Sequence, residues 1–339
     1  MARSARQTVL SAGYVPLDIV SYQGRVWHAA GGTAGNVAAI LGFLGWQASL
    51  VADLGDDLAG RQARGDLMKA NVSVDLVRLR SEVATPRLVH EVSASSHRYL
   101  FRCPTCGQRF PTSRPLRSDR AHELIDQNLE PDVFFFDRLN AGTILLAEHY
   151  SSMGSLIVFE PSRVARADLT KRAVKVAHVI KHADDRDAEL DHVVAPNGQV
   201  RVITRGAEGA RFRIGNGVWH HSPAFSYPIV DAGGAGDWTT AGLVHTLPLT
   251  ERRTVQAVGD ALRWAQALAA VSCGAPGARG LARQQSAEAV LKAAKFLEQR
   301  GEQLARDETF EKWTSRAVRG PICKSCLLPV TQVNVAATA

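Results

Sequence analysis

The sequence has no hydrophobic run long enough to cross a membrane. Its longest nearly apolar stretch covers residues 38–52, which is shorter than the roughly 20 residues of a spanning helix, and Gln47 and Ser49 interrupt it. The apolar run after the basic N-terminus is too short and too broken for a signal peptide. We therefore expect a cytoplasmic protein without a membrane partner.

Internal repeats, low-complexity segments and long runs of one charge are also lacking. The chain has 339 residues and a net charge of +7, spread along its length rather than gathered in a tail. A positive balance suits an anionic partner such as a phosphate compound or a nucleic acid, and the even spread makes nucleic acid the less favoured of the two. Hydrophobic residues make up 45% and charged residues 22%, which is the composition of a globular protein with a substantial core.

Three familiar chemical motifs are absent as well. No Gly-Lys dipeptide occurs, which excludes a Walker A phosphate loop. The stretch from His122 to Asp126 lacks the second histidine of a zincin. The glycine-rich segments do not contain Gly-x-Gly-x-x-Gly after a strand, so a Rossmann dehydrogenase fits poorly.

Short apolar runs alternate with helical patterns along most of the chain. A helix is expected from Asn36 to Leu44, and a long helical pattern covers residues 287–313. A hairpin is expected at residues 88–93 and 97–102, followed by an insertion at 103–115 that is rich in Pro, Cys and Gly. The expected strands cover residues 14–20, 47–52, 133–136, 156–159, 177–180 and 200–203. This alternation predicts an α/β fold with a mostly parallel central sheet and helices on both faces.

The strongest chemical motif is the glycine-rich run from Asp231 to Asp237, which leads from a strand-like entry into a helix. Small residues let backbone N–H groups converge on one point, and the helix N-terminus adds partial positive charge, so the run predicts an anion cradle. Asp237 falls in the first helical turn, where its carboxylate could accept a proton from an attacking hydroxyl. A glycine-rich turn with an aspartate at the helix start remains an open alternative for this motif alone.

Two further glycine-rich turns accompany it. The first, residues 30–38, opens a helix, and Asn36 within it offers both a donor and an acceptor to a polyol. The second, residues 203–210, follows an expected strand. Each of these turns is weak evidence when taken alone.

Taken together and in this order, the motifs resemble the ribokinase-like (PfkB) family of carbohydrate and nucleoside kinases. The resemblance covers about residues 10–295, and its C-terminal signature is the specific part. The matching segments are Gly31-Gly32 with Asn36-Val37-Ala38, Gly55-Asp56-Asp57 with Gly60, Thr204 to Gly209, Asp231 to Asp237, and Ser272 to Ala278.

The resemblance implies a ribokinase-like fold with a small β lid formed by the hairpin at about residues 86–102. It implies an ATP-dependent phosphotransferase that transfers the γ-phosphate to a hydroxyl of a sugar or nucleoside. Asp237 would be the catalytic base, and the amides of Gly234, Ala235 and Gly236 would form the anion hole. The implied substrate-binding residues are Asp18, on the first strand, with Gly31, Gly32 and Asn36.

For the nucleotide, the resemblance implies that Thr204, Arg205, Gly206 and Gly209 lie along ATP, whose phosphates would carry Mg²⁺. The family's Asn-x-x-Glu motif is altered here, because His182 stands for the asparagine and Asp185 for the glutamate. A second departure is the bulky Trp238 directly after the catalytic aspartate. The resemblance is also compatible with a K⁺ ion near Asp231 and the loop at Ala275, and with a homodimer formed through the lid.

Four of the five cysteines form two Cys-x-x-Cys pairs, Cys103 with Cys106 and Cys323 with Cys326. Two such turns can supply the four thiolates of a tetrahedral, structural Zn²⁺ site, and a reduced compartment favours a metal over disulfides. Disulfides and unrelated surface cysteines remain the alternatives. If zinc binds, the segment 296–339 would pack back on the insertion at 103–115 and fix the shape of the lid.

A second function remains open at this point. In it, the kinase fold is a catalytically degenerate scaffold, and a zinc ribbon with a basic face binds nucleic acid or a protein partner. The identity of the sugar or nucleoside, and the hydroxyl that is phosphorylated, do not follow from the residues.

Overall fold

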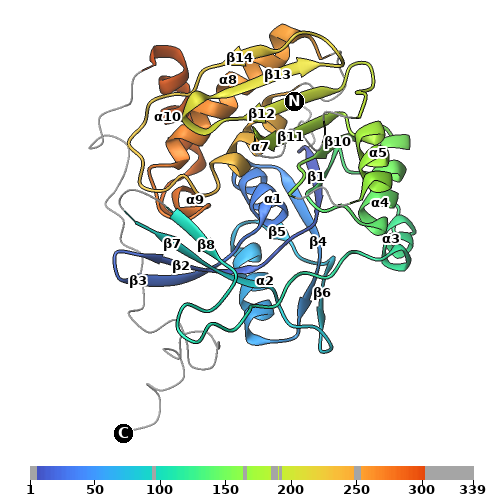
Figure 1. Ribbon diagram of the computed structural model, residues 1–339, viewed down its shortest axis with the longest axis vertical. Coiled ribbons are helices and arrows are strands. Elements are labelled where there is room, and N and C mark those ends of the chain that lie inside the picture. Colours follow the sequence, from blue (N-terminus) through green and yellow to red (C-terminus); the bar gives the residue numbers. More distant parts are fainter. Residues whose placement is uncertain are drawn as a thin grey trace, which may run out of the picture.

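A computed structural model describes residues 6–93, 97–162, 166–184, 190, 193–247 and 253–301. Within this part the strands form a large sheet, which occupies the centre of the molecule, and a smaller one beside it (Figure 1). Cys323, Cys326 and Asp185 lie outside the described residues.

The central sheet has ten strands, in the order β14-β13-β12-β11-β10-β9-β1-β4-β5 with β6 beside β4. All neighbouring pairs are parallel except β12 with β13 and β13 with β14, which are antiparallel. The strands are β1 (Thr8–Ala12), β4 (Gln47–Gly55), β5 (Val72–Ser73), β6 (Val77–Arg80), β9 (Val133–Phe136), β10 (Leu156–Phe159), β11 (Val179–Ala183), β12 (Val200–Thr204), β13 (Ala210–Ile214) and β14 (His220–Ser222).

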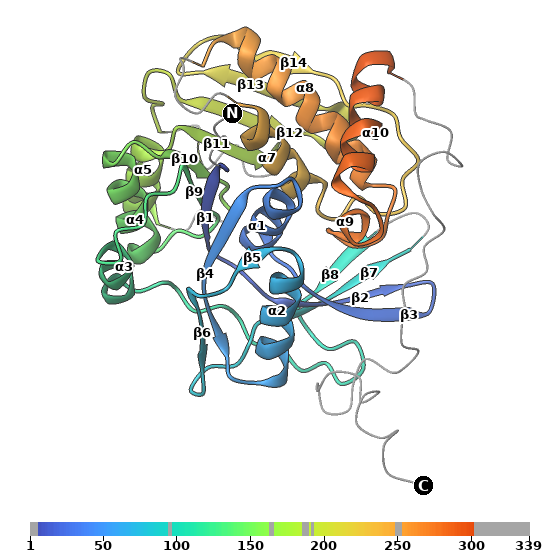
Figure 2. The ribbon, with the colours of Figure 1, turned by 180° about the vertical axis from the view of Figure 1, so that it is seen from behind.

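Helices cover both faces of this sheet, as the sequence predicts (Figures 1 and 2). Along β9, Val133 and Phe135 enter one hydrophobic core and Phe134 and Phe136 enter the other, because successive side chains point to opposite faces. A strand buried on both faces reads as a continuous apolar run, which explains the pattern of residues 133–136.

The first core is covered by α1 (Thr33–Phe43), α2 (Leu58–Lys69), α7 (Ala235–Thr246), α8 (Val255–Ser272) and α10 (Ala287–Arg300). The second is covered by α3 (Ser118–Ile125), α4 (Ala141–Ser152) and α5 (Ala167–Val176). None of the helices in the described ranges is both long and apolar enough to span a bilayer.

The smaller sheet, called the lid sheet below, has the strand order β3-β2-β7-β8. Its strands are β2 (Leu17–Tyr22), β3 (Arg25–Ala30), β7 (Arg87–Val92) and β8 (His97–Leu100). The expected hairpin is confirmed, since β7 and β8 pair antiparallel from Val89 with Leu100 to Val92 with His97. The short helix α9 (Gly280–Gln284) lies close by, where Arg279 donates a hydrogen bond to the backbone oxygen of Ala30 at the end of β3.

The strand expected at residues 14–20 is present as β2 (Leu17–Tyr22), but it is not the first strand of the chain. The first strand of the central sheet is β1, and Asp18 lies instead on β2 of the lid sheet. The apolar pattern of β1 is diluted by Ser11, whose buried hydroxyl donates to the backbone oxygen of Ala34 at 2.8 Å. That contact is tertiary, so a local pattern does not show it.

Two boundaries also differ from the sequence prediction. Strand β4 continues to Gly55, beyond the expected strand at 47–52, because β6 pairs with residues 52–55. Helix α10 ends at Arg300, where Gly301 takes a left-handed C-cap conformation with a φ of 67°. The rest of the expected helix, from 302 to 313, lies outside the described residues.

Candidate active site

Charged side chains gather where the parallel strands of the central sheet end. Asp137 follows β9, Glu160 follows β10, and Lys181 lies at the middle of the short strand β11. All three are buried, at 1%, 7% and 2% exposure. In open α/β sheets the carboxyl ends of the strands are where ligands bind, so this edge is the first candidate for a site.

Helix α7 begins at this edge. Gly234 is its N-cap and has a φ of 86°, while Ala235 and Gly236 are its first two residues. A Cβ atom on Gly234 would lie 2.4 Å from the Cβ of Ala278, so both the backbone conformation and the packing require glycine there. The first-turn N–H groups of a helix lack intrahelical acceptors and carry partial positive charge, which makes this helix start suited to a phosphate group.

Asp237 lies in the first turn of α7 and is 9% exposed. Its Oδ2 accepts a hydrogen bond from Nδ2 of Asn36 on α1 at 2.7 Å. Burial, together with the negative charge of Glu160, raises the pKa of Asp237 to about 7, although Lys181 acts in the opposite direction. A carboxyl group with this pKa can accept and release a proton near neutral pH.

Lys181 and Glu160 form a buried ion pair that sequence reasoning missed. Nζ of Lys181 is 2.6 Å from Oε1 of Glu160 and donates to the backbone oxygen of Gly236 at 2.9 Å. Thr240 on α7 donates its hydroxyl to Oε2 of Glu160 at 2.5 Å. The sequence offered one signal for the pair: a lysine within the apolar run of residues 179–183 needs a buried partner.

Asp18 reaches the same region from the lid sheet. It is 7% exposed, and a Cβ atom on Gly31 would lie 1.9 Å from its Oδ2, so the two residues are in direct contact. Burial raises the pKa of Asp18 to about 8, Arg279 lowers it, and the charge of Asp237 adds to the increase. Asp237 is therefore close enough for its charge to raise the pKa of Asp18.

Two buried oxygens in this region have no hydrogen-bond partner among the described residues, Oδ1 of Asp18 and Oδ1 of Asn36. Unpaired buried acceptors are rare in folded proteins, and hydroxyl groups of a ligand would satisfy them. Gly32 has a different role, because it is the N-cap of α1 with a φ of 73° and a Cβ there would lie 2.1 Å from the backbone oxygen of Tyr14. Glycine at 32 is thus required by the backbone.

The residues expected on the nucleotide side form one tight turn after β12. Thr204 ends the strand, Arg205 donates its N–H to the backbone oxygen of Gly209 at 2.8 Å, and residues 206–208 form a single 3-10 turn. Gly209 has a φ of 90°, and a Cβ there would lie 2.3 Å from the backbone oxygen of Ser222. The turn lies at the carboxyl end of β12, beside the carboxyl end of β11, and thus at the same edge of the sheet as Asp137 and Glu160.

The first cysteine pair lies on a tight turn directly after the lid hairpin. The N–H of Gly107 donates to the backbone oxygen of Cys103 at 2.9 Å, and that of Cys103 donates to the backbone oxygen of Gln108 at 2.9 Å. Cys103 is buried and Cys106 is exposed. The third described cysteine, Cys273, caps α8, and its backbone oxygen accepts from Val230 and Asp231, so it is a packing residue.

Comparison with known proteins agrees with this geometry. Residues 8–101 and 172–285, more than half of the chain, match the pfkB family carbohydrate kinase pattern. The chain is 29% identical over 296 residues to the ATP-dependent ribose-1-phosphate kinase of Halopiger xanaduensis, covering 80% of this chain and 93% of the relative. It is 23% identical over 301 residues to the aminoimidazole riboside kinase of Salmonella typhimurium, covering 81% and 91%.

Solved structures share the fold. The fructokinase from Xylella fastidiosa with bound ATP superposes with a TM-score of 0.67 at 18% identity, covering 87% of this chain and 99% of that one. The aminoimidazole riboside kinase from Salmonella enterica, complexed with aminoimidazole riboside and an ATP analog, has a TM-score of 0.61 at 22% identity, covering 80% and 94%. The glycine-rich starts of α1 and α7 and the fold agree with these matches. The chain therefore belongs to the pfkB family of carbohydrate kinases.

Proposed function

We propose that the chain transfers the γ-phosphate of ATP to a hydroxyl of a sugar or nucleoside, with Asp237 as the base. The observation that carries the proposal is the position of Asp237, buried in the first turn of α7 and hydrogen-bonded to Asn36. A pKa of about 7 lets its carboxylate take the proton of the attacking hydroxyl at neutral pH.

The amides of Gly234, Ala235 and Gly236 stabilise the charge of the transferring phosphoryl group in this proposal. The contact between Lys181 and the backbone oxygen of Gly236, at 2.9 Å, places a positive charge behind the same helix start. Lys181 is thus a positioning residue that holds the first turn of α7 against β11.

Substrate hydroxyls bind between Asp18, Gly31 and Asn36. The unpaired oxygens of Asp18 and Asn36 support this assignment, because a polyol supplies the donors that they lack. The relatives are named for ribose 1-phosphate, fructose and aminoimidazole riboside, so a phosphorylated pentose, a hexose and a nucleoside are the substrate classes to test first.

ATP lies along the turn formed by Thr204, Arg205, Gly206 and Gly209. When bound, Mg²⁺ neutralises the charge of the ATP phosphates so that an alkoxide can approach, and Asp185 is the residue proposed to face it. We also propose a monovalent cation near Asp231 and Ala275. One solved relative, a fructokinase from Vibrio cholerae, is described in a form with bound fructose, ADP and potassium ion.

The four-cysteine zinc site, the dimer and the location are further proposals. In support, the first Cys-x-x-Cys pair lies on one tight turn, closed by the hydrogen bond from Gly107 to the backbone oxygen of Cys103, and Cys323 and Cys326 are the proposed second pair. For a dimer through the lid, β8 is an edge strand, and Phe101 directly after it is 55% exposed. A cytoplasmic location agrees with thiolates that bind a metal.

The test measures ADP release by the full chain with ATP and a panel of sugars, sugar phosphates and nucleosides. The expected result is turnover with one substrate class, and its loss in Asp237→Asn by a factor of about 100 to 10,000. Asp126→Asn, on an exposed residue at the end of α3, is the matched control and should keep full activity.

The degenerate-scaffold alternative predicts another result. It expects no ADP release with any acceptor, and binding of RNA or DNA that weakens steeply with salt. No observation on the described residues favours it, since the base and the helix start beside it are both in place.

A further inference from the structure

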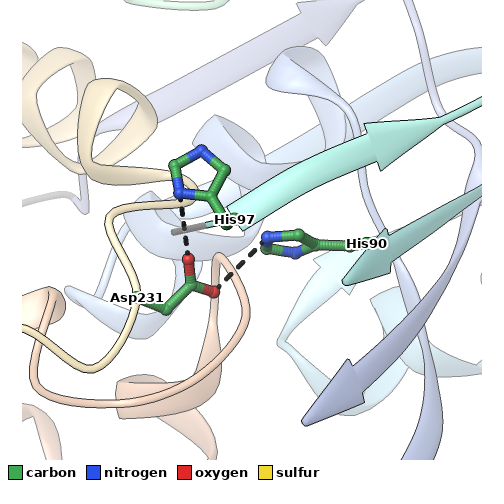
Figure 3. A group of neighbouring side chains, drawn as sticks. All are labelled: His90, His97 and Asp231. Carbon is green, nitrogen blue, oxygen red and sulfur yellow. Dashed lines mark ion pairs between the residues drawn. The ribbon is translucent and has the colours of Figure 1, made fainter. Parts of the chain in front are cut away.

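His90, His97 and Asp231 converge at the junction between the lid sheet and the loop that precedes α7 (Figure 3). His90 lies on β7, His97 begins β8, and Asp231 is in the loop before the helix. We propose that these three residues bind one divalent transition-metal ion, with Zn²⁺ as the best chemical match, and that this ion fastens the lid sheet to the loop.

The distances fit a metal better than direct hydrogen bonds. Nε2 of His90 is 3.5 Å from Oδ2 of Asp231, and Nδ1 of His97 is 3.5 Å from Oδ1. Both exceed the usual N–H···O range of about 2.7–3.2 Å. Two atoms that ligate a tetrahedral zinc ion, each about 2.0–2.1 Å from it, lie about 3.3 Å apart. The two histidines face different oxygens of Asp231, and the three ligand atoms lie within 4.8 Å of one another, so the site must contract for one ion to contact all three.

An unsatisfied nitrogen points to the same conclusion. His90 is 1% exposed, and its buried Nε2 faces Oδ2 of Asp231 at 3.5 Å, without a hydrogen bond of ordinary length among the described residues. A buried ring nitrogen in this state needs an explanation, and a metal ion provides one. The side chain of His97 is 31% exposed, which gives an ion a path from solvent into the site.

The carboxylate is held in place by backbone donors. The N–H of Gly233 donates to Oδ1 of Asp231 at 2.8 Å, and that of Gly277 donates to Oδ2 at 2.7 Å. Each oxygen accepts one of these bonds and keeps lone-pair capacity toward the histidines. Hydrogen bonds to a ligating carboxylate fix its orientation, as outer-shell partners do in metal sites.

The two histidines separate this site from the other cations of the reaction, although the monovalent cation is also proposed to lie near Asp231. Two imidazoles and one carboxylate suit Zn²⁺ and its transition-metal neighbours, whereas Mg²⁺ and K⁺ prefer oxygen ligands. The site also differs from the proposed four-cysteine site, because it contains no sulfur.

An ion at this position would affect how the lid sheet contacts the loop before α7. A Cβ atom on Gly233 would lie 2.5 Å from Cε1 of His90, so the lid sheet rests directly on the loop that leads into α7. An ion shared by His90, His97 and Asp231 would hold that contact closed and slow the exchange of substrate beneath the lid. This consequence rests on the proposed function, whereas binding of the ion does not.

The experiment uses the full chain, stripped with a chelator and dialysed, then titrated with ZnCl₂ and separately with CoCl₂. We compare wild type, His97→Ala, and His122→Ala as the control, since His122 is an exposed histidine on α3. The expected result is that wild type and His122→Ala bind one more equivalent of Zn²⁺ than His97→Ala, or bind it at least about tenfold more tightly. We also compare the absorption spectra with Co²⁺. The part of the wild-type spectrum that is missing in His97→Ala should contain no thiolate charge-transfer bands, because such bands belong to a cysteine site.

Melting curves recorded in chelator separate metal binding from folding. His97 is partly exposed on an edge strand, so His97→Ala should melt within a few degrees of wild type without metal. With Zn²⁺, wild type and His122→Ala should gain more stability than His97→Ala, which keeps only the proposed four-cysteine site. MgCl₂ and KCl should give no difference between the variants.

Equal zinc stoichiometry, affinity and thermal shift in wild type and His97→Ala would overturn the proposal. A histidine-dependent zinc equivalent in a chain that shows no ADP release would support the site and count against the proposed function alone.

Discussion

Asn36 of α1 donates its side-chain amide to the carboxylate of Asp237 of α7 across 2.7 Å and 201 positions of sequence. The bond joins the two glycine-rich turns that the sequence singles out, one at the start of each helix. The bond places Asn36, which is proposed to bind the substrate, next to Asp237, the proposed base. A hydroxyl bound by Asn36 would therefore lie beside that base.

Removal of this bond should change the ionisation of the base. In Asn36→Ala, the donor that lowers the pKa of Asp237 is lost, so the pKa should rise above about 7 and the rate at neutral pH should fall. The pH profile of kcat/KM for the phosphoryl transfer is the measurement, with Asn216→Ala in an exposed turn as the control. A profile identical to wild type would contradict the role of the bond.

The wild-type profile follows from the same carboxyl group. Asp237 acts as a base only when ionised, and its pKa is about 7, so kcat/KM should increase as the pH rises from 6 to 8 and then level off. Steady-state rates in buffers of constant ionic strength check this. An activity that stays flat down to pH 5 would show that Asp237 titrates near its ordinary value.

The buried ion pair should matter for stability. Lys181→Met leaves Glu160 buried without its charged partner, which typically costs about 3–5 kcal/mol in the free energy of unfolding. Urea denaturation measures the loss. In the double variant Lys181→Met with Glu160→Gln the charge is removed from both sides, and we expect a large part of the loss to be recovered; no recovery would mean that the two side chains act independently.

Gly31 should be intolerant of a side chain. A Cβ atom in Gly31→Ala would lie within 2.3 Å of both carboxylate oxygens of Asp18, so Asp18 must move away from its position. We expect KM for the acceptor to rise by about tenfold or more while KM for ATP changes little. Gly65→Ala on α2 has open space around its Cβ and serves as the control, with unchanged KM values.

The burial of Asp18 predicts a pH-dependent stability. Its pKa is 3.8 when unfolded and about 8 when folded, so the folded state holds more protons between these values and its stability falls as the pH rises through that window. Asp18→Asn removes this term. The variant should therefore gain stability relative to wild type at pH 8 and show a smaller gain at pH 5, measured by thermal unfolding at both values.

The second pair of cysteines should be required for bound zinc at the proposed four-cysteine site. Cys323→Ser combined with Cys326→Ser should lower zinc content and melting temperature together, because a structural zinc ion contributes directly to folding. Elemental analysis and calorimetry measure both. Unchanged zinc stoichiometry would contradict the site, and His97→Ala keeps these four cysteines and thus separates the two zinc proposals.

The fold class could be predicted because its signals are local. The apolar runs at β9, β10 and β12 and the glycine-rich helix starts are contiguous in sequence, and the structure has them where the pattern indicates. The family's C-terminal signature is contiguous as well, and the structure places its Asp237 in the first turn of α7, as the sequence predicts.

The errors and omissions share a different cause. The sequence did not predict β1, because Ser11 interrupts its apolar run. The hydroxyl of Ser11 finds its hydrogen-bond acceptor in the backbone oxygen of Ala34, which is distant in sequence. The pairing of Lys181 with Glu160, and of His90 and His97 with Asp231, joins residues from separate elements. No spacing rule connects such residues, so their proximity appears only once the strand order is known.

The hydrogen bond from Lys181 to Gly236 has a consequence for motion during turnover. It fastens the first turn of α7 to a central strand, so the anion-binding amides move with the rigid sheet. In the proposed function, opening and closing over the substrate would then fall to the lid sheet, whose four strands pair with one another. In amide hydrogen exchange, β9 to β11 should be protected for much longer than β7 and β8, and a bound acceptor should slow exchange mainly in the lid sheet.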